Sequence, residues 1–490
     1  MKKFTKKYSG VKMDNEKAII IGAGGAGKEL LNEFIAGSYP INILGFIDDN
    51  VTESIKSFPI LGKIENLKQI IPKYGIKIVF IAMPATEGEL LKKIYLECIK
   101  FPVKIKLIPR YSEILLNRVN LTQLREISVE DIIGKKVTKK MFENISKKVE
   151  GKTFIVFGAA GSIGSKLCQQ IASLCPKKLI MVDWSENGMF YLEDKINKII
   201  KTNDKVSLNN FSYYIGNIQD EVRMNQIIGS EKPDVIINAA AYKHVPLMEL
   251  NYYEAIKNNV MGSKNLYEIA IKHQVKNFIL ISSDKAVNPT NIMGVTKRIT
   301  EKMMHYYASL DNSKTSFLAV RFGNVINSNG SVIPTFQKQI REGRITITHK
   351  DIIRYFMSID EAVYLILQCW VQGTNDEIFV LDMGEPIKII DLATLMIKIA
   401  GLELDKDVKL EFIGLRPGEK LYEEPLTKIE ETLATKNDKI YILKRDEEFD
   451  HKEFIDTVTQ LVNVSGEKTF DEVKPILKKL VPTYKEFDMV

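Results

Sequence analysis

The stretch SSDKAVNPTNIMGVTK, residues 282–297, gathers side chains that can transfer protons. An apolar, strand-like run (NFILIS) leads directly into Ser283, Asp284 and Lys285. The carboxyl ends of strands in open α/β sheets are where such proteins bind ligands, and general acid–base catalysis needs an acid and a base placed there. The alternative is an ordinary surface ion pair in a loop.

A helix is expected to follow this stretch, with Asn291 as its N-cap. Met293 and Lys297 are four residues apart and therefore share one face of that helix. A thioether cannot accept a proton, so any proton transfer beside Met293 must fall to other groups.

A glycine motif after a strand predicts a dinucleotide site. In KTFIVFGAAGSIGSKLCQQIA, Gly158, Gly161 and Gly164 have the spacing G-x-x-G-x-x-G. Glycine lets the backbone approach a pyrophosphate, and the following helix N-terminus favours its negative charge. The next strand, KLIMVDW, ends in Asp183, nineteen residues after Gly164. A carboxylate there can hold both adenosine ribose hydroxyls and repels a 2′-phosphate, which favours NAD over NADP.

A second, earlier glycine motif predicts another unit of the same kind. KAIIIGAGGAGKELLNEFIAG contains Gly22, Gly24 and Gly27 in G-x-G-x-x-G spacing, and the next strand ends in Asp48 and Asp49. Strand, glycine turn, helix and acid together favour a nucleotide-binding fold. Two interpretations stay open: a bound nucleotide, or glycines needed only for tight packing.

The predicted fold class is α/β, with two Rossmann-like parallel-sheet domains and a smaller α/β substrate-binding portion at the end of the second. We expect a basic tail over 1–15 and a first Rossmann-like domain over 16–110. A connector over 111–150 leads to the catalytic domain with its substrate-binding lobe, 151–435, and then to a helical extension, 436–490. A chain of 490 residues is long enough for two or three domains.

Composition excludes several classes of protein. The net charge is +7, but five lysines lie in MKKFTKKYSGVKM, and the remainder carries only +2. The rest of the chain has no basic stripe interleaved with aromatic residues, so nucleic-acid binding is not expected. The lysine-rich start is either a solvated tail or a segment facing anionic lipid. No apolar run is long enough to span a membrane and no signal peptide is recognisable, so a cytoplasmic location is expected. Four scattered cysteines predict neither a metal site nor disulfides.

Seven ordered motifs resemble one known family. They are GAAGSIGS, DWSENGMFYLE, NAAAYKHVPLME, SSDKAVNPTNIMGVTKR, RFGNVINSNGSVIPTFQKQI, RYFMSIDEAV and RPGEKLYEE. In this order they resemble the polysaccharide-biosynthesis nucleotide-sugar 4,6-dehydratases, which are extended short-chain dehydrogenases/reductases. The likeness covers about residues 125–435 and is greatest to the large, membrane-anchored UDP-N-acetylglucosamine 4,6-dehydratases. Those proteins usually begin with transmembrane helices, so membrane association through a segment missing from this chain is one implication; a homo-oligomer is another.

The resemblance implies an internal redox dehydration with NAD as a retained cofactor. Hydride leaves carbon 4 of the sugar, a base removes the hydrogen of carbon 5, water departs from carbon 6, and the hydride returns to carbon 6. By resemblance Asp284 is the acid at carbon 6 and Lys285 the base at carbon 5. These roles ask for a raised pKa at Asp284 and a lowered pKa at Lys285. Ser283 would bond the carbon-4 oxygen, and Lys297 the nicotinamide ribose.

The remaining expected site residues bind ligands. Arg354 and Arg416 would bind the substrate phosphates, with Asn324 nearby, and Glu419 would hold the uridine ribose. Lys243 and His244 would line the cleft. The residues expected to bind the cofactor are Gly158, Gly161, Ser162, Ile163, Gly164, Asp183, Asn217, Ala239 and Lys297.

Two positions depart from the common family pattern. Asn217, in GNIQD, replaces an acid expected near the adenine, and Met293 stands where smaller relatives keep a tyrosine. The carbon-4 proton must then pass to Lys285, Asp284 or a water held by Ser283. Two alternatives to a dehydratase stay open: a nucleotide-sugar epimerase on the same fold, which normally needs the tyrosine, and a non-catalytic nucleotide-binding regulator.

Overall fold

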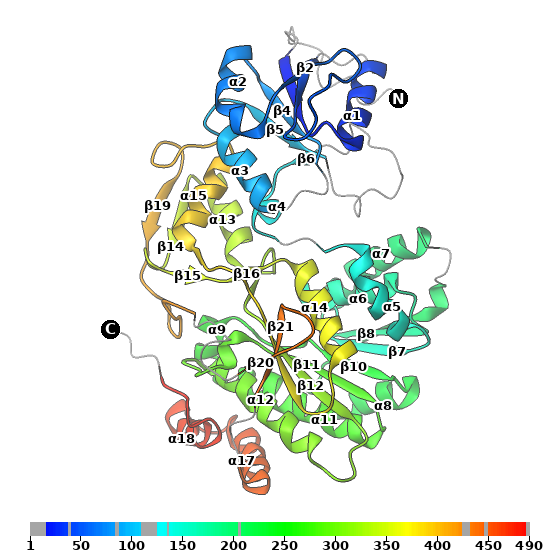
Figure 1. Ribbon diagram of the computed structural model, residues 1–490. Coiled ribbons are helices and arrows are strands. Elements are labelled where there is room, and N and C mark those ends of the chain that lie inside the picture. The colour runs from blue at the N-terminus through cyan, green and yellow to red at the C-terminus, as the bar shows by residue number, and fades with distance from the viewer. Residues whose placement is uncertain are drawn as a thin grey trace. The chain divides into compact units, whose positions relative to one another are not determined.

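The chain divides into two compact units, residues 1–138 with 398–402, and residues 139–397 with 403–490. The computed structural model describes residues 16–37, 41–83, 88–108, 125–134, 137–203, 207–423, 432–444 and 449–486. The predicted basic tail, 1–15, and residues 111–124 and 135–136 of the predicted connector lie outside these ranges. Figure 1 traces both units.

The first unit is built on a six-stranded sheet in the order β3-β2-β1-β4-β5-β6. The first five strands are parallel, and β6 joins the edge antiparallel. Residues 125–134, which the sequence placed in the connector, thus supply β6 and α4 of this unit. The elements are β1 Glu16–Ile21, α1 Gly25–Ala36, β2 Ile41–Ile47, β3 Ile60–Gly62, α2 Leu67–Tyr74, β4 Ile78–Ile81, α3 Gly88–Cys98, β5 Lys104–Leu107, β6 Arg125–Glu126 and α4 Val129–Ile133.

The turn between β1 and α1 is tight enough to require glycine. Gly22 has a φ of +101°, which L side chains rarely adopt, and a Cβ at Gly27 would lie 1.9 Å from the Gly22 carbonyl oxygen. The Asp48 carboxylate, at the end of β2, accepts the Ala23 amide at 2.7 Å. These contacts hold α1 close to β1 and β2. They match one of the two interpretations left open by the sequence, in which the glycines serve tight packing.

The second unit is built on a nine-stranded sheet in the order β20-β21-β17-β12-β11-β10-β7-β8-β9. The seven strands from β17 to β9 are parallel, and the chain order reverses between β7 and β10. Ligands bind at such a reversal, outside the carboxyl ends of the strands. The parallel strands are β7 Thr153–Phe157, β8 Lys178–Asp183, β9 Phe211–Ile215, β10 Val235–Asn238, β11 Asn277–Ile281, β12 Ser316–Arg321 and β17 Glu377–Leu381.

Helices cover both faces of this sheet (Figure 1). On one face α5, α6, α7 and α14 pack together, and on the other α8, α9, α11 and α12. The bounds are α5 Glu143–Val149, α6 Ser162–Ser173, α7 Glu186–Lys201, α8 Glu221–Glu231, α9 Val245–Leu250, α10 Tyr252–Ala255, α11 Gly262–Lys272, α12 Ile292–Ala308 and α14 Ile359–Gln372. The doubly wound fold predicted from the sequence is confirmed.

A smaller lobe and a helical hairpin complete the second unit. The lobe has three two-stranded pairings, β13 with β16, β14 with β19, and β15 with β18. Its elements are β13 Asn324–Val325, α13 Val332–Arg341, β14 Arg344–Ile347, β15 Ile353–Arg354, β16 Phe356–Met357, β18 Ile387–Lys388, α15 Ile389–Ile399 and β19 Lys409–Phe412. Strands β20 Thr432–Ala434 and β21 Ile440–Leu443 then return to the large sheet, and α17 His451–Val464 packs on α18 Phe470–Leu480.

Within the described ranges, none of the helices is long and apolar enough to cross a membrane. In the same part of the chain, no cluster of three or more His, Cys, Asp or Glu side chains could hold a metal ion.

Candidate active site

The glycine turn after β7 is shaped by close backbone contacts. Gly158 has a φ of +72°, and a Cβ there would lie 2.6 Å from the Ala240 nitrogen. A Cβ at Gly164 would lie 1.9 Å from the Gly158 carbonyl oxygen, whereas the nearest atom to a Cβ at Gly161 is 3.2 Å away. Gly158 and Gly164 therefore fix the fold of the turn, and Gly161, the N-cap of α6, is less crowded.

The acid at the end of β8 supports this turn. One oxygen of Asp183 accepts the Ala160 amide and the other the Ser185 amide, each at 2.9 Å. A carboxylate oxygen has further lone pairs, so these bonds leave capacity for the ribose hydroxyls that the sequence assigned to Asp183. Asn217 lies just after β9, and its side-chain oxygen accepts the Gln219 amide at 3.0 Å.

The other predicted cofactor residues line the same edge of the sheet. Ser162 and Ile163 open α6, and Ala239 follows β10 directly. The Ser162 hydroxyl accepts the Asn329 amide at 2.9 Å, which ties the glycine turn to the loop before α13.

Helix α12 carries Met293 and Lys297 in its first turns. The Asn291 side chain accepts the Gly294 amide at 2.8 Å, so the N-cap predicted from the sequence is confirmed. A Cβ at Gly294 would lie 2.2 Å from the Lys285 carbonyl oxygen, so the helix can approach the acid–base stretch only because glycine stands there. Met293 is 3% exposed and packs in the core.

Lys297 is buried in a way that suits an oxygen-rich ligand. Its side chain is 6% exposed, and burial lowers its pKa to about 8 even though Glu301 acts in the opposite direction. Among the described residues no carboxylate is within ion-pairing distance of its ammonium group. A glycine turn together with a buried lysine lacking such a partner fits a dinucleotide.

The depressed pKa of Lys297 makes a testable prediction about stability. Its folded pKa lies below the unfolded value near 10.4, so the unfolded chain binds more protons between pH 8 and 10. The free energy of unfolding should therefore rise with pH across that window. We expect the nucleotide-free protein to gain about 2 kcal/mol between pH 7.5 and 9.5 relative to Lys297→Met, measured by urea unfolding. Parallel pH profiles for the two proteins would contradict this assignment.

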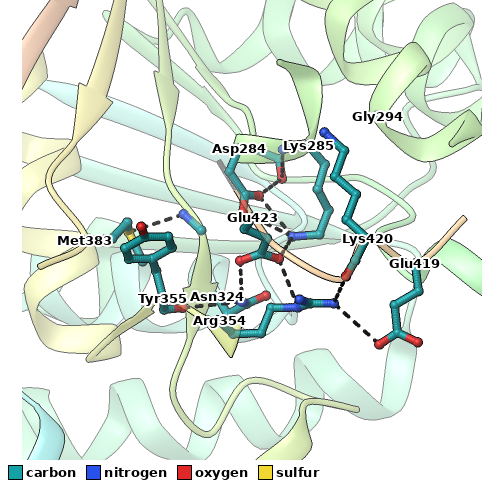
Figure 2. Close-up of polar contacts among 12 residues, drawn as sticks. Asp284, Lys285, Gly294, Asn324, Arg354, Tyr355, Met383, Glu419, Lys420 and Glu423 are labelled. Atoms are coloured by element: carbon teal, nitrogen blue, oxygen red, sulfur yellow. Dashed lines mark hydrogen bonds and ion pairs between the residues drawn. The ribbon is translucent and has the colours of Figure 1, made fainter. Parts of the chain in front are cut away.

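Asp284 and Lys285 form the centre of a partly buried charge cluster, in which the Lys285 side chain is 24% exposed (Figure 2). The 3₁₀ turn after β11, Asp284–Ala286, begins at Ser283, whose hydroxyl donates to Asp284 Oδ1 at 2.8 Å. Lys285 Nζ lies 3.0 Å from Asp284 Oδ1 and 3.1 Å from Glu423 Oε1. The Asp284 side chain is 8% exposed and that of Glu423 is 6% exposed.

The electrostatics of this cluster correct one expectation. Burial acts to lower the pKa of Lys285, but the carboxylates of Asp284 and Glu423 outweigh it and raise that pKa above its usual range. The lowered pKa expected for Lys285 is therefore wrong for the ligand-free protein. The sequence argument considered only Asp284 as a partner, and Glu423 adds a second negative charge.

Arg354 lies on β15 and binds the segment that carries Glu423. Its guanidinium donates to the carbonyl oxygens of Ile353 and Lys420, each at 2.7 Å, and its Nε lies 3.2 Å from Glu423 Oε1. Glu419 lies 3.5 Å from Nη2. All three guanidinium nitrogens thus have protein partners, and contacts of Arg354 and Glu419 with the substrate phosphates and ribose stay a prediction.

The other predicted substrate residues are spread more widely. Asn324, on β13, donates to Glu423 Oε2 at 3.1 Å and so joins the cluster. Lys243 follows β10. The pKa of Lys243 is lowered, mainly by burial and also by the positive charge of Lys285. His244 precedes α9 and packs against Gly330, and burial lowers its pKa too. Arg416 is exposed; its backbone amide donates to the Glu419 carboxylate at 3.1 Å, and its carbonyl oxygen accepts the Glu419 amide at 3.0 Å.

Sequence reasoning missed Glu423 and a buried ion pair behind the cluster. Arg321, at the end of β12, binds Glu301 of α12 through two bonds of 2.7 and 2.6 Å, and both side chains are fully buried. Ser282 donates to the same carboxylate at 2.5 Å, so β11, β12 and α12 are tied together beside Ser283. The only available signal for Glu423 was its place in the motif RPGEKLYEE.

Comparison with known proteins shows the family. Residues 154–445, more than half of the chain, match the model of a family described as polysaccharide biosynthesis protein, and residues 3–109 match that of a CoA-binding domain. The chain belongs to the polysaccharide biosynthesis protein family. The matched region forms the Rossmann-like α/β sheet of the second unit, as the sequence predicted.

Individual relatives differ in their stated activities. The probable polysaccharide biosynthesis protein EpsC of Bacillus subtilis is 41% identical over 85% of this chain and 69% of its own length. A UDP-N-acetylglucosamine 4,6-dehydratase (inverting) of Campylobacter jejuni is 31% identical over 56% of this chain and 77% of its own. A UDP-glucose 4-epimerase of Rickettsia canadensis is 34% identical over 56% of this chain and 76% of its own length. Identity alone does not separate a dehydratase from an epimerase.

Proposed function

We propose that the protein is an NAD-dependent 4,6-dehydratase that removes water from UDP-N-acetylglucosamine. The observation that carries the proposal is the partly buried charge cluster that Asp284 and Lys285, just after β11, form with Glu423. Removing a hydroxyl and a carbon-bound hydrogen requires an acid and a base side by side, and this cluster supplies both. The relationship to a dehydratase of Campylobacter jejuni supports the same activity.

Residues of the second unit are suited to hold the cofactor. Gly158 and Gly161 shape the turn for a pyrophosphate, Asp183 stands at the ribose position, and Lys297 offers an ammonium group to the nicotinamide end. When bound, NAD⁺ accepts a hydride from carbon 4 and later returns it to carbon 6.

The bond between Ser283 and Asp284 offers a route for the carbon-4 proton. Because the Ser283 hydroxyl donates to Asp284 Oδ1 at 2.8 Å, it can accept a proton from the substrate hydroxyl while passing its own to Asp284. Asp284 is then protonated and can act as the acid for the hydroxyl leaving carbon 6. This route uses no tyrosine, and Met293, which is buried, only fills space.

A nucleotide-sugar epimerase is the second candidate, favoured by the relative from Rickettsia canadensis. The resemblance drawn from the sequence implies that epimerases use a tyrosine at the position of Met293 and need neither Asp284 nor Lys285. A purely regulatory nucleotide-binding protein would need no buried acid and base at all. The cluster therefore favours the dehydratase over both alternatives.

One incubation separates the three functions. The purified protein is mixed with UDP-N-acetylglucosamine without added NAD, and the sugar nucleotides are analysed by mass spectrometry. We expect a product lighter than the substrate by one water. A product of unchanged mass would show an epimerase, and unchanged substrate would show a binding protein.

The first unit is expected to act through folding rather than chemistry, because it contributes no residue to the cluster. Gly22→Asp places a side chain at a φ of +101° with its Cβ 2.5 Å from Met83, so solubility and thermal stability should fall. Gly24→Asp is the matched control, since no atom lies within 4 Å of a Cβ there. Turnover per folded active site should be unchanged in both. A large loss of turnover in well-folded Gly22→Asp would show that this unit takes part in the reaction.

A further inference from the structure

Glu423 bridges the base and the lobe of the second unit (Figure 2). Its Oε1 lies 3.1 Å from Lys285 Nζ and 3.2 Å from Arg354 Nε, and its Oε2 accepts Asn324 at 3.1 Å. The side chain is 6% exposed. A buried carboxylate held by three donors from three elements has one fixed orientation, and one of its oxygens faces Lys285.

The proposed reaction leaves a proton without an acceptor. Lys285 must be a neutral amine to remove the hydrogen of carbon 5, but in this structure it is an ammonium ion between two carboxylates. Asp284 cannot receive the proton of Lys285 if it takes the proton of the carbon-4 hydroxyl through Ser283. Among the described residues, Glu423 is the remaining carboxylate within hydrogen-bonding distance of Lys285.

We propose that Glu423 is the proton acceptor for Lys285 and thereby converts it into the base for carbon 5. This inference rests on the proposed dehydratase function and names a further catalytic group for it. Arg354 and Asn324 are positioning residues in this account, because they hold the Glu423 carboxylate in line with the Lys285 ammonium group.

The protons balance over one complete cycle. The carbon-4 hydroxyl proton reaches Asp284 through Ser283, and the Lys285 proton moves to Glu423. Lys285 then takes the hydrogen of carbon 5 as a proton, and Asp284 gives its proton to the departing hydroxyl, which leaves as water. As hydride arrives at carbon 6, Lys285 returns a proton to carbon 5. Glu423 finally gives its proton back to Lys285, so all three groups recover their starting charges.

The surroundings of Glu423 suit a group that gains and loses a proton. Burial, reinforced by the Asp284 carboxylate, raises the pKa of Glu423, while Lys285 and Arg354 act in the opposite direction. The charged or titratable groups that influence it are Lys285 and Asp284 from the turn after β11, Arg354 from β15, and the neighbouring Tyr355, whose own pKa is raised mainly by burial. A carboxyl group balanced between these influences can accept a proton from an adjacent ammonium group.

The test compares wild type with Glu423→Gln, which keeps the shape but cannot accept the proton. Each protein, with its NAD retained, is mixed with UDP-N-acetylglucosamine, and both the absorbance of reduced nicotinamide and the mass of the product are followed. We expect the variant to form reduced nicotinamide but to release the dehydrated product about 10²–10⁴-fold more slowly. Its turnover should also rise nearly tenfold per pH unit from pH 7 to 9, as solvent takes over the Lys285 proton, while wild type changes less.

The reduced-nicotinamide signal reports that the variant is folded, and Glu423→Asp should recover part of the turnover. Glu411→Gln, on the exposed strand β19, is the control and should behave as wild type. Unchanged turnover in Glu423→Gln, or a loss without reduced nicotinamide and without the pH slope, would overturn the role of Glu423. Absence of a dehydrated product from wild type itself would overturn the proposed function, so the two failures are distinguishable.

Discussion

Lys285→Ala and Asp284→Asn are each expected to slow turnover of UDP-N-acetylglucosamine by about 10²–10⁴-fold, because each removes a proton-transfer group. The two side chains meet at 3.0 Å and share one partly buried site. Steady-state turnover of each purified variant, normalised to its retained NAD, is the measurement. Retained NAD is the control for folding, since we assign the cofactor to the glycine turn, Asp183 and Lys297 rather than to these two side chains.

Met293→Leu is the matched comparison on the same site. Met293 is 3% exposed and cannot carry a proton, so leucine should cost less than about tenfold in turnover. Lys297→Ala should be severe for another reason, because it removes the ammonium group that we assign to the cofactor. If Met293→Leu proves as damaging as Lys285→Ala, the explanation of the missing tyrosine is wrong.

The second large effect is expected at the glycine turn. Gly158→Ala introduces a Cβ 2.6 Å from the Ala240 nitrogen at a φ of +72°, which should lower the free energy of unfolding by about 3 kcal/mol or more. Gly161→Ala meets its nearest atom at 3.2 Å and should fold better than Gly158→Ala, but retain less NAD because its methyl group would lie at the N-terminus of α6, where we propose that the pyrophosphate binds.

Thermal unfolding and NAD content, measured on both variants, check this separation. Gly158→Ala should unfold at a lower temperature than wild type. Gly161→Ala should contain less NAD, with little change in its unfolding temperature. Equal stability losses in the two variants would contradict the different roles assigned to Gly158 and Gly161.

Sequence patterns predicted the parts of the fold that depend on local spacing. A strand, a glycine turn and a helix occur within about twenty residues of each other in both units, so the two doubly wound sheets could be predicted. The N-cap at Asn291 was predictable for the same reason, since its partner, the Gly294 amide, is three residues away.

Contacts between distant segments were not predictable from local patterns. Lys285 and Glu423 are 138 residues apart in the chain, and Asn324 and Glu423 are 99 apart. The pKa of Lys285 is raised partly by that distant carboxylate, whereas the sequence-based expectation was a lowered pKa. The partners of Arg354 could not be predicted for the same reason, because four of its five partner residues lie 65 to 69 residues away: Glu419, Lys420, Leu421 and Glu423.

The edges of the two sheets show another limit. Strands β6, β20 and β21 are short and run antiparallel to their neighbours. The sequence placed β6 in the connector, β20 at the end of the catalytic domain and β21 in the helical extension. Segments of two to four residues carry too little hydrophobic alternation to be recognised as strands.

The central claim is that hydride moves within one sugar molecule from carbon 4 to carbon 6 while water is lost. The most direct test uses UDP-N-acetylglucosamine carrying deuterium at carbon 4, incubated with the protein without added NAD, and locates the label by NMR. We predict a 4-keto product, one water lighter, with the deuterium on carbon 6. Deuterium that stays on carbon 4 in a sugar of unchanged mass would contradict the proposed dehydratase.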